Sequence, residues 1–127
     1  MSRDEYLIDL RPAINATLEK CNDLELFQNN TLRPILKLQN ALLINLVRDY
    51  FKVHKKNTEA YTFTARRLLV KEAINKDLFL RNSLTYMIVG LFTENEFNFF
   101  SGNKKEVSKR ILSMATKRVQ DQIELVS

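Results

Sequence analysis

The sequence predicts an all-α fold, a single-domain bundle of about five or six helices, on three observations. The chain of 127 residues contains only two Gly, far below the usual share of roughly 7%, so it lacks the turn residues on which hairpins and sandwiches depend. Apolar residues make up 45% of it, and a chain of this length can build a core without disulfides or metals. Three segments also begin with the residue spacing of a helix capping box.

A capping box of Ser2 and Glu5 marks the first helix. Proline inside a helix clashes with the carbonyl four residues earlier, so Pro12 should stop or kink this helix. Residues 13–30 are then expected to form short helical turns.

A long helix is expected from Thr31 to about residue 54. Thr31 can cap it, and Pro34 falls in the first turn, where its missing N–H breaks no helical bond. The apolar residues of this segment recur at helical spacing and form one stripe: Leu32, Ile35, Leu36, Leu43, Leu46, Tyr50 and Val53. A polar loop from His54 to Thr58 follows.

The next helix should begin near Thr64, and Asp77 can either cap a new helix or lie at a kink. Residues 78–92 are apolar in nearly every direction around a helix, which is typical of a helix buried on most sides. We therefore expect this central helix inside the bundle.

Capping boxes also begin the last two helices. Thr93 starts a short helix that ends at Gly102, because Glu96 follows three residues later. Asn103, with a glutamate at the same spacing, starts a final helix that runs to about Val126.

Six polar residues interrupt otherwise apolar faces. Two of them are His54 and Gln122, and the other four are the candidate ligand-binding residues Gln39, Arg81, Asn82 and Arg118. One hypothesis is that they converge on a pocket between helices, where both guanidinium groups bind a carboxylate or phosphate of a small anionic ligand. The alternative, which we favour, is structural, because polar groups removed from water need partners. The amides would then bridge backbone groups at helix crossings, while the arginines extend to solvent or pair with acids across a subunit contact.

The middle of the chain is basic and interleaved with aromatic residues. Its candidate nucleic-acid-binding residues are Lys55, Lys56, Arg66 and Arg67, and a second basic cluster near the start of the last helix is Lys104, Lys105, Lys109 and Arg110. Such a mixture can bind nucleic acid through phosphates, with strong salt dependence and little sequence preference. Solvated helix ends explain the same pattern, and the segment 54–64 is too long for a helix-turn-helix bend. Nucleic acid is therefore a possible partner but not the favoured one.

The sequence contains no recognisable catalytic or metal-binding motif. A helical metal site needs several His and Glu ligands, whereas this chain has one His. Two glycines cannot build a phosphate-binding loop, and Cys21 and His54 lack an orienting acid at a recognisable spacing. We expect no metal and no cofactor, and we favour a non-enzymatic protein.

A cytoplasmic location is expected from three features. Cys21 has no second cysteine with which to form an internal disulfide, and the first residues lack the pattern of a secretory signal. The longest charge-free apolar stretch, Leu84 to Phe92, is about half the length that a membrane-spanning helix requires.

Two stretches, Phe27 to Gln39 and Arg81 to Thr93, resemble a family of short all-helical bacterial proteins of unknown function. Some of its members carry an automatic glyoxalase label. Metal-dependent glyoxalases resemble paired β-rich modules with His and Glu ligands, which one His and two Gly do not fit. The resemblance implies an all-helical fold and no functional residues.

The leading functional hypothesis is a small interaction protein that forms a homodimer through the apolar face of a long helix. Both long helices carry an apolar stripe with an intruding Arg or Gln, and such residues often fix the register of helix contacts. The rival hypotheses are the small-anion pocket, as a binding site or an enzyme, and the basic nucleic-acid surface.

Overall fold

The computed structural model describes residues 2–12 and 22–126, in which every regular element is a helix. The predicted all-α bundle is confirmed. In chain order the elements are α1 (Arg3–Leu10), α2 (Asp23–Phe27), the π turn η1 (Gln28–Leu32), α3 (Arg33–Leu38), α4 (Asn40–Val53), the 3-10 turn η2 (Thr58–Ala60), α5 (Phe63–Lys76), α6 (Leu78–Val89), α7 (Glu94–Gly102), α8 (Lys104–Asp121) and the 3-10 turn η3 (Ile123–Leu125).

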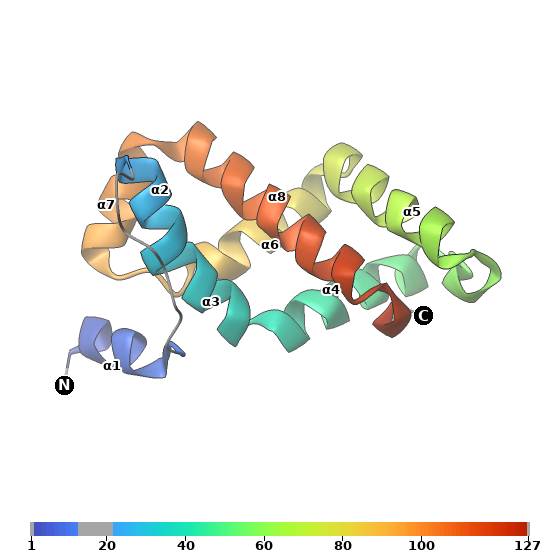
Figure 1. The fold of residues 1–127 in the computed structure, drawn as a ribbon, viewed down its shortest axis with the longest axis horizontal. Coiled ribbons are helices and arrows are strands. Elements are labelled where there is room, and N and C mark those ends of the chain that lie inside the picture. The colour runs from blue at the N-terminus through green and yellow to red at the C-terminus, as the bar shows by residue number, and fades with distance from the viewer. Residues whose placement is uncertain (1, 13–21, 127) are drawn as a thin grey trace.

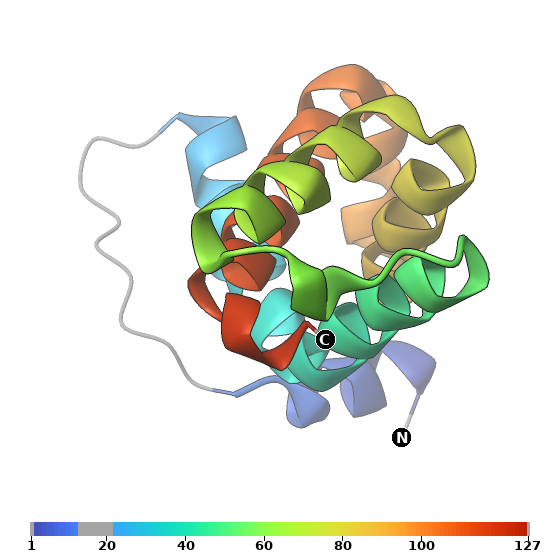
Figure 2. The ribbon, with the colours of Figure 1, turned by 90° about the vertical axis from the view of Figure 1, so that its right-hand side faces the viewer.

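Helix α8 lies at the centre of the helix contacts. Figure 1 shows it crossing the length of the molecule, from the end that holds α2 and α7 to the end that holds α4, α5 and the C-terminus. It contacts α4, α5, α6, α7 and η1. Viewed end-on in Figure 2, α4, α5, α6 and α8 surround a common axis.

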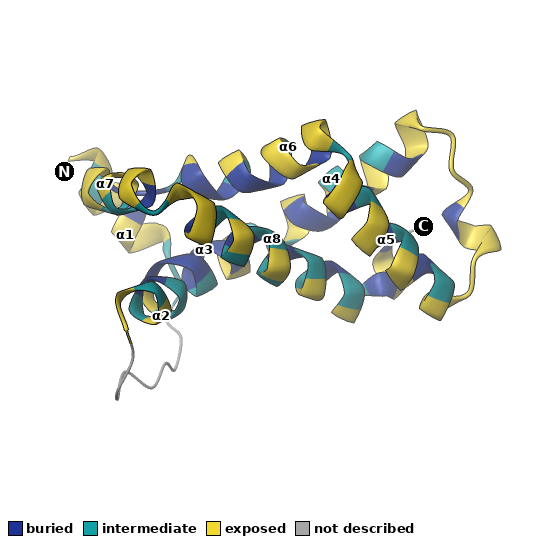
Figure 3. Cartoon of the chain, turned by 90° about the horizontal axis from the view of Figure 1, so that it is seen from above, coloured by how far each residue is buried: buried dark blue, intermediate teal, exposed yellow. Residues whose placement is uncertain are grey.

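The core fills the space between these helices. Figure 3 shows the buried segments on the inner sides of the helices and the exposed ones outside. Side chains with no exposed surface come from across the chain, among them Leu32, Leu43, Leu84, Ile111 and Ile123. Burial of such residues stabilises the fold by roughly 1.5–3 kcal/mol for each large side chain.

The first helix is placed as predicted. The Ser2 hydroxyl accepts a hydrogen bond from the Glu5 N–H at 3.3 Å, and the helix ends at Leu10, before Pro12. The predicted turns over residues 13–30 are described only from residue 22 onward, where α2 and part of η1 account for them.

The predicted start of a helix at Thr31 is wrong. The helix already begins at Asp23 and widens into the π turn η1, in which the Arg33 N–H donates to the Gln28 carbonyl five residues earlier. Because Pro34 has no N–H and its ring crowds the preceding turn, this wider turn lets the helix continue through a proline.

The predicted helix to residue 54 is also interrupted. Gln39, at φ −89° and ψ 5°, separates α3 from α4, and α4 then runs to Val53. The polar loop after His54 forms as predicted and contains η2.

Asp77 caps a new helix, α6. The sequence left open whether this residue would cap a helix or lie at a kink. Its backbone is extended, and its carboxylate accepts hydrogen bonds from the Leu80 N–H at 2.9 Å and the Tyr50 hydroxyl at 3.0 Å. The Leu80 N–H above all lowers the pKa of Asp77. Helix α5, capped by Thr62, begins at Phe63, close to the predicted position.

Replacing Asp77 by alanine should lower the free energy of unfolding, because α6 loses its N-terminal cap. Asp77→Asn retains a side-chain oxygen and should cost only a small part of this loss. Urea denaturation followed by far-UV circular dichroism measures both variants. Equal losses for the two variants would contradict the capping role.

The prediction that the 78–92 helix is buried on most sides is wrong. Only one side of α6 faces the core, through Leu80, Leu84, Thr85, Ile88 and Val89. The outer side exposes Leu78, Phe79 and Tyr86, with exposed fractions of 66%, 76% and 52%. An apolar pattern all round the helix therefore reflects a core face and an exposed apolar face. The helix also ends at Val89 rather than at residue 92.

The last two helices begin where predicted, with one difference in capping. Thr93 and Glu96 form both hydrogen bonds of the capping box. Asn103 precedes α8 but makes no cap, because its amide donates to the Phe99 carbonyl at 2.9 Å instead. Within the described residues, no helix has the length and apolar character needed to cross a membrane.

Candidate functional site

The structure does not bring the four candidate ligand residues together. The Gln39 amide donates to the Met87 carbonyl at 3.2 Å, which ties the break between α3 and α4 to α6. Arg81 lines a groove between α5, α6 and α8, whereas Asn82 is exposed on the outer face of α6. Arg118 lies between α4 and α8.

Arg118 belongs to a polar cluster that joins α4 to α8. Its guanidinium donates to the Asn40 side-chain oxygen at 3.2 Å, and the amides of Asn40 and Gln122 exchange hydrogen bonds of 2.9 and 2.8 Å. Burial, followed by the neighbouring charge of Arg33, lowers the pKa of Arg118. Arg33 and Arg118 line one shallow cavity of about 460 Å³.

The four candidate nucleic-acid-binding residues have different environments. Arg66 is buried, and it donates to the carbonyls of Thr58 at 3.0 Å, Tyr61 at 3.3 Å and Ile123 at 3.5 Å. Its guanidinium therefore holds together the loop before α5 and the C-terminal turn η3. Lys55 and Lys56 are exposed in the loop after α4.

Arg67 is exposed and ties α5 to α8. Its Nε donates to the Gln120 carbonyl at 3.1 Å, and the Gln120 amide donates to the Arg67 carbonyl at the same distance. Gln120 in turn lines the groove that contains Arg81, which places Arg67 at the groove's edge.

This groove, which we call the basic groove, is a hollow of about 1000 Å³ between α5, α6 and α8. Its lining includes five cationic side chains and one carboxylate, that of Asp121: the cations are Lys71, Arg81, Lys105, Lys109 and Lys117. Neutral hydrogen-bonding groups lie between them, namely Asn75, Ser108, Ser113, Thr116 and Gln120. The groove is thus strongly positive and rich in donors.

The cations of α8 form a row along one side of the basic groove. Lys105, Lys109 and Lys117 are spaced by four and eight residues, so they lie on one face of the helix and span about 18 Å. The row continues past the groove, because Lys117 also lines the shallow cavity of Arg33 and Arg118.

The predicted second basic cluster is divided by the fold. Lys105 and Lys109 enter the basic groove, whereas Arg110 donates to the Gln28 side chain at 2.8 Å and Lys104 lies over the Phe100 ring. Sequence proximity alone could not separate these residues, because the two pairs face different neighbours of α8.

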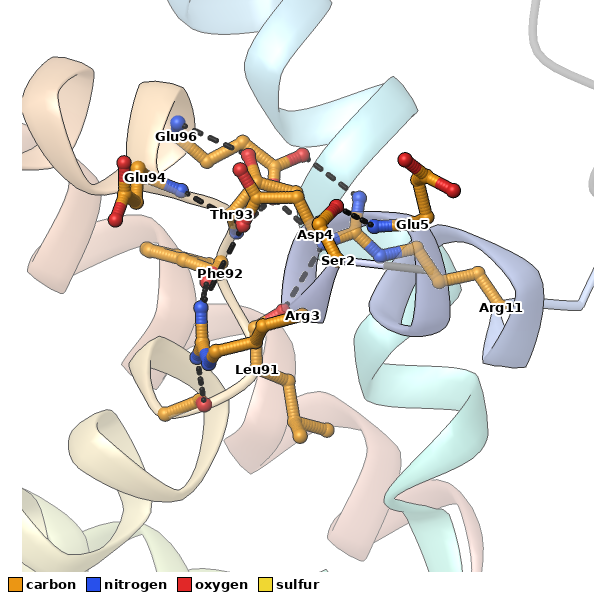
Figure 4. A network of polar contacts seen from close by, with 11 residues as sticks. Ser2, Arg3, Asp4, Glu5, Arg11, Leu91, Phe92, Thr93, Glu94 and Glu96 are labelled. Atoms are coloured by element: carbon orange, nitrogen blue, oxygen red, sulfur yellow. Dashed lines mark hydrogen bonds and ion pairs between the residues drawn. The ribbon is translucent and has the colours of Figure 1, made fainter.

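A second polar centre lies where α1 docks onto the start of α7 (Figure 4). Arg11 forms a two-pronged ion pair with the Glu96 carboxylate, with N to O distances of 2.7 and 2.6 Å, and it also donates to the Leu91 carbonyl. Glu96 accepts two further hydrogen bonds, from the Thr31 hydroxyl and from the Thr93 N–H.

Burial and hydrogen bonding act against each other at Glu96. Burial would raise the pKa of its carboxyl, but the bonds from Arg11 and the Thr93 N–H outweigh that effect and hold the pKa below its ordinary value. Every oxygen is therefore occupied by a donor within the fold. This cluster therefore stabilises the fold and is not a reactive site. The only sequence pattern that indicated it was the capping box of Thr93 and Glu96.

The described residues offer no metal centre. No group of three or more His, Cys, Asp or Glu side chains in ranges 2–12 and 22–126 could hold an ion. The His54 ring lies against the Tyr50 ring at a centroid distance of 4.1 Å and a tilt of 32°, and its Nδ1 is 2.8 Å from the Tyr50 carbonyl oxygen. Cys21, the other candidate nucleophile or base, lies outside the described residues.

The chain was compared with protein-family models, curated proteins and solved structures, and none of the three comparisons gave a match.

Proposed function

We propose that this protein binds the phosphate backbone of nucleic acid in the basic groove, without sequence preference. The observation that carries the proposal is the lining of the groove, in which five cations face a single carboxylate. Lysine and arginine that neutralise phosphates release condensed counterions, and this release supplies most of the free energy of nonspecific binding.

A polymeric ligand fits the groove better than a single small anion. A small anion requires cations that converge on one point, as in a two-armed arginine site. Here the cations are instead distributed over three helices and along about 18 Å of α8, and the row extends to Arg118. Each strand of a duplex advances about 3.4 Å per phosphate, so this length spans about five phosphates.

The uncharged lining favours phosphate contacts over base contacts. Hydroxyl and amide side chains such as Ser108, Ser113 and Asn75 are common donors to phosphate oxygens. No aromatic side chain is among the groove residues, so the groove lacks the stacking surface that single-strand-binding proteins use. We therefore infer binding to the sugar-phosphate backbone, with duplex bound at least as well as single strand.

The decisive variant reverses two charges in the groove, Lys109→Glu with Lys117→Glu. Fluorescence anisotropy of a labelled duplex, and of a single strand of equal length, should show binding by the unmodified protein at low salt. We expect the double variant to bind at least tenfold more weakly. The slope of its affinity against salt should fall by about two, one unit for each phosphate that the groove no longer neutralises.

The matched control is Lys37→Glu with Lys52→Glu, which alters the net charge equally at two exposed positions on α3 and α4. It should retain most of the affinity. Equal weakening by both double variants would show that only net charge matters, and absence of binding by the unmodified protein would refute the proposal. Displacement of the duplex by polyglutamate at matched charge concentration would point to an acidic protein partner instead.

A further inference from the structure

The outer face of α6 exposes apolar side chains that the bundle does not cover. Phe79 is 76% exposed and Tyr86 is 52% exposed, and Asn82, which is also exposed, lies between them. Seven residues separate the two aromatics, so the three side chains lie along one stripe of the helix. We call this stripe the α6 outer face.

Two neighbouring side chains enlarge the α6 outer face. Leu78 is 66% exposed at the start of the helix. Phe97 on α7 is 47% exposed and contacts the Phe100 ring, which also contacts Tyr86. Phe100 is itself buried, so Phe97 on α7 and Tyr86 on α6 are two exposed aromatic side chains that contact one covered ring. Clustered exposed apolar side chains are typical of interaction sites.

The order of residues on this stripe is self-complementary. A two-fold axis between Asn82 and Ser83 would run two copies of α6 antiparallel and place Phe79 of each copy against Tyr86 of the other. It would also set the Asn82 amide opposite the partner's Ser83 hydroxyl, which can exchange a hydrogen bond. A two-fold symmetric dimer requires such a self-complementary surface. Every contact between one residue of the first copy and another residue of the second copy occurs a second time with the two copies exchanged.

The charge distribution favours a second copy over a partner of opposite charge. Arg81 is the only charged residue of α6, and its side chain lines the basic groove instead. An uncharged face therefore meets an uncharged face, while the net charge of +5 is carried elsewhere on each copy. A basic or acidic partner would find no complementary charge on this stripe.

The available area sets the strength of the contact. A whole aromatic side chain has a surface of about 200 Å². At their exposed fractions, the four apolar side chains of this face together expose on the order of 400 Å²: Leu78, Phe79, Tyr86 and Phe97. That is about half of what each partner contributes to a standard stable interface. The contact is thus suited to a reversible, concentration-dependent association.

From these observations we propose that two copies of this chain associate through the α6 outer face, antiparallel about an axis between Asn82 and Ser83. The contact uses neither the apolar stripe of α4 nor that of α8, because most residues of both stripes are buried or half-buried within one copy, with Val53 at the end of α4 as an exposed exception. It is also independent of nucleic-acid binding in the groove.

Oxidative cross-linking tests the register of the proposed dimer. In a Cys21→Ser background, Asn82→Cys should form a covalent dimer at least tenfold faster than Glu59→Cys, which is exposed on η2. Adding Phe79→Ser to the Asn82→Cys protein should remove the difference. Equal rates for the two cysteine variants would overturn the antiparallel register.

Sedimentation velocity tests the association itself. We expect the average mass to rise toward that of a dimer with concentration, and the association to strengthen from 50 to 300 mM salt, because salt screens the repulsion between two copies of charge +5. Nucleic-acid binding has the opposite salt dependence. Phe79→Ser should remain monomeric, whereas the exposed control Leu68→Ser should behave as the unmodified protein. A monomer at every concentration would overturn the proposal and leave this face to another kind of partner.

Discussion

Replacing Glu96 by alanine should lower the free energy of unfolding by about 3–5 kcal/mol, the range found when one partner of a buried ion pair is removed. The Arg11 and Glu96 side chains are only 8% and 16% exposed. The substitution leaves the Arg11 guanidinium, the Thr31 hydroxyl and the Thr93 N–H without their acceptor. Urea denaturation followed by circular dichroism measures the loss.

Glu94→Ala is the matched control, since it removes an exposed carboxylate from the same turn of α7. Its expected cost is within about 0.5 kcal/mol. Glu96→Gln should lie between the two. Its amide oxygen still accepts from the Thr93 N–H, but its NH2 group is a donor where the carboxylate accepted from Arg11 and Thr31. Similar stabilities for Glu94→Ala and Glu96→Ala would show that the buried pair contributes nothing.

Acid titration gives a second measure of Glu96. Its pKa in the folded protein lies below the ordinary value of about 4.3, so the unfolded chain binds the proton more readily. The stabilisation is complete above that ordinary value and is lost as the pH falls through it toward the folded pKa. The Glu96→Gln protein should therefore lose less stability in this range than the unmodified protein, with Asp77 adding the same slope to both.

The second large effect is expected at Arg66. Arg66→Met should lower the free energy of unfolding by about 3 kcal/mol, because the Thr58, Tyr61 and Ile123 carbonyls lose their common donor in a buried setting. Thermal and urea unfolding should both detect this loss.

Two comparisons isolate the guanidinium of Arg66. Arg66→Lys keeps the charge, but one ammonium cannot reproduce three donors in a planar fork, so it should recover less than half of the loss. Arg67→Met removes the exposed neighbour and should cost less than about 1 kcal/mol. Full recovery by lysine would show that charge, rather than geometry, is what the fold uses.

Helix boundaries set by short-range contacts could be predicted from the sequence. Ser2 and Thr93 bind N–H groups three residues away, so their signals need no knowledge of the fold. Thr31 also has a hydroxyl that could cap a helix, but it lies inside a helix that has already begun. Its hydroxyl donates to Glu96 instead. Its role depended on a contact 65 residues away, which no local pattern contains.

The candidate sites depended even more on distant contacts. Arg66 and Arg67 are adjacent and chemically identical, yet one is buried beneath η3 and the other is exposed beside Gln120. The basic groove combines residues of α5, α6 and α8, of which the sequence indicated several without showing that they share a surface. Composition could predict a basic protein, but only the packing of α8 shows where the cations gather.

The docking of α1 has a consequence for how the molecule opens. Leu7 is its one buried residue, and most of its attachment consists of Arg3 and Arg11 donating to carbonyls between α6 and α7, together with the Glu96 ion pair. Apart from the Arg11–Glu96 pair, water can replace these hydrogen bonds at less cost than it can hydrate apolar side chains of the core. We expect amide protons of α1 to exchange through a local opening at a lower free energy than those of α8, so that α1 detaches as a separate unit while the bundle remains folded.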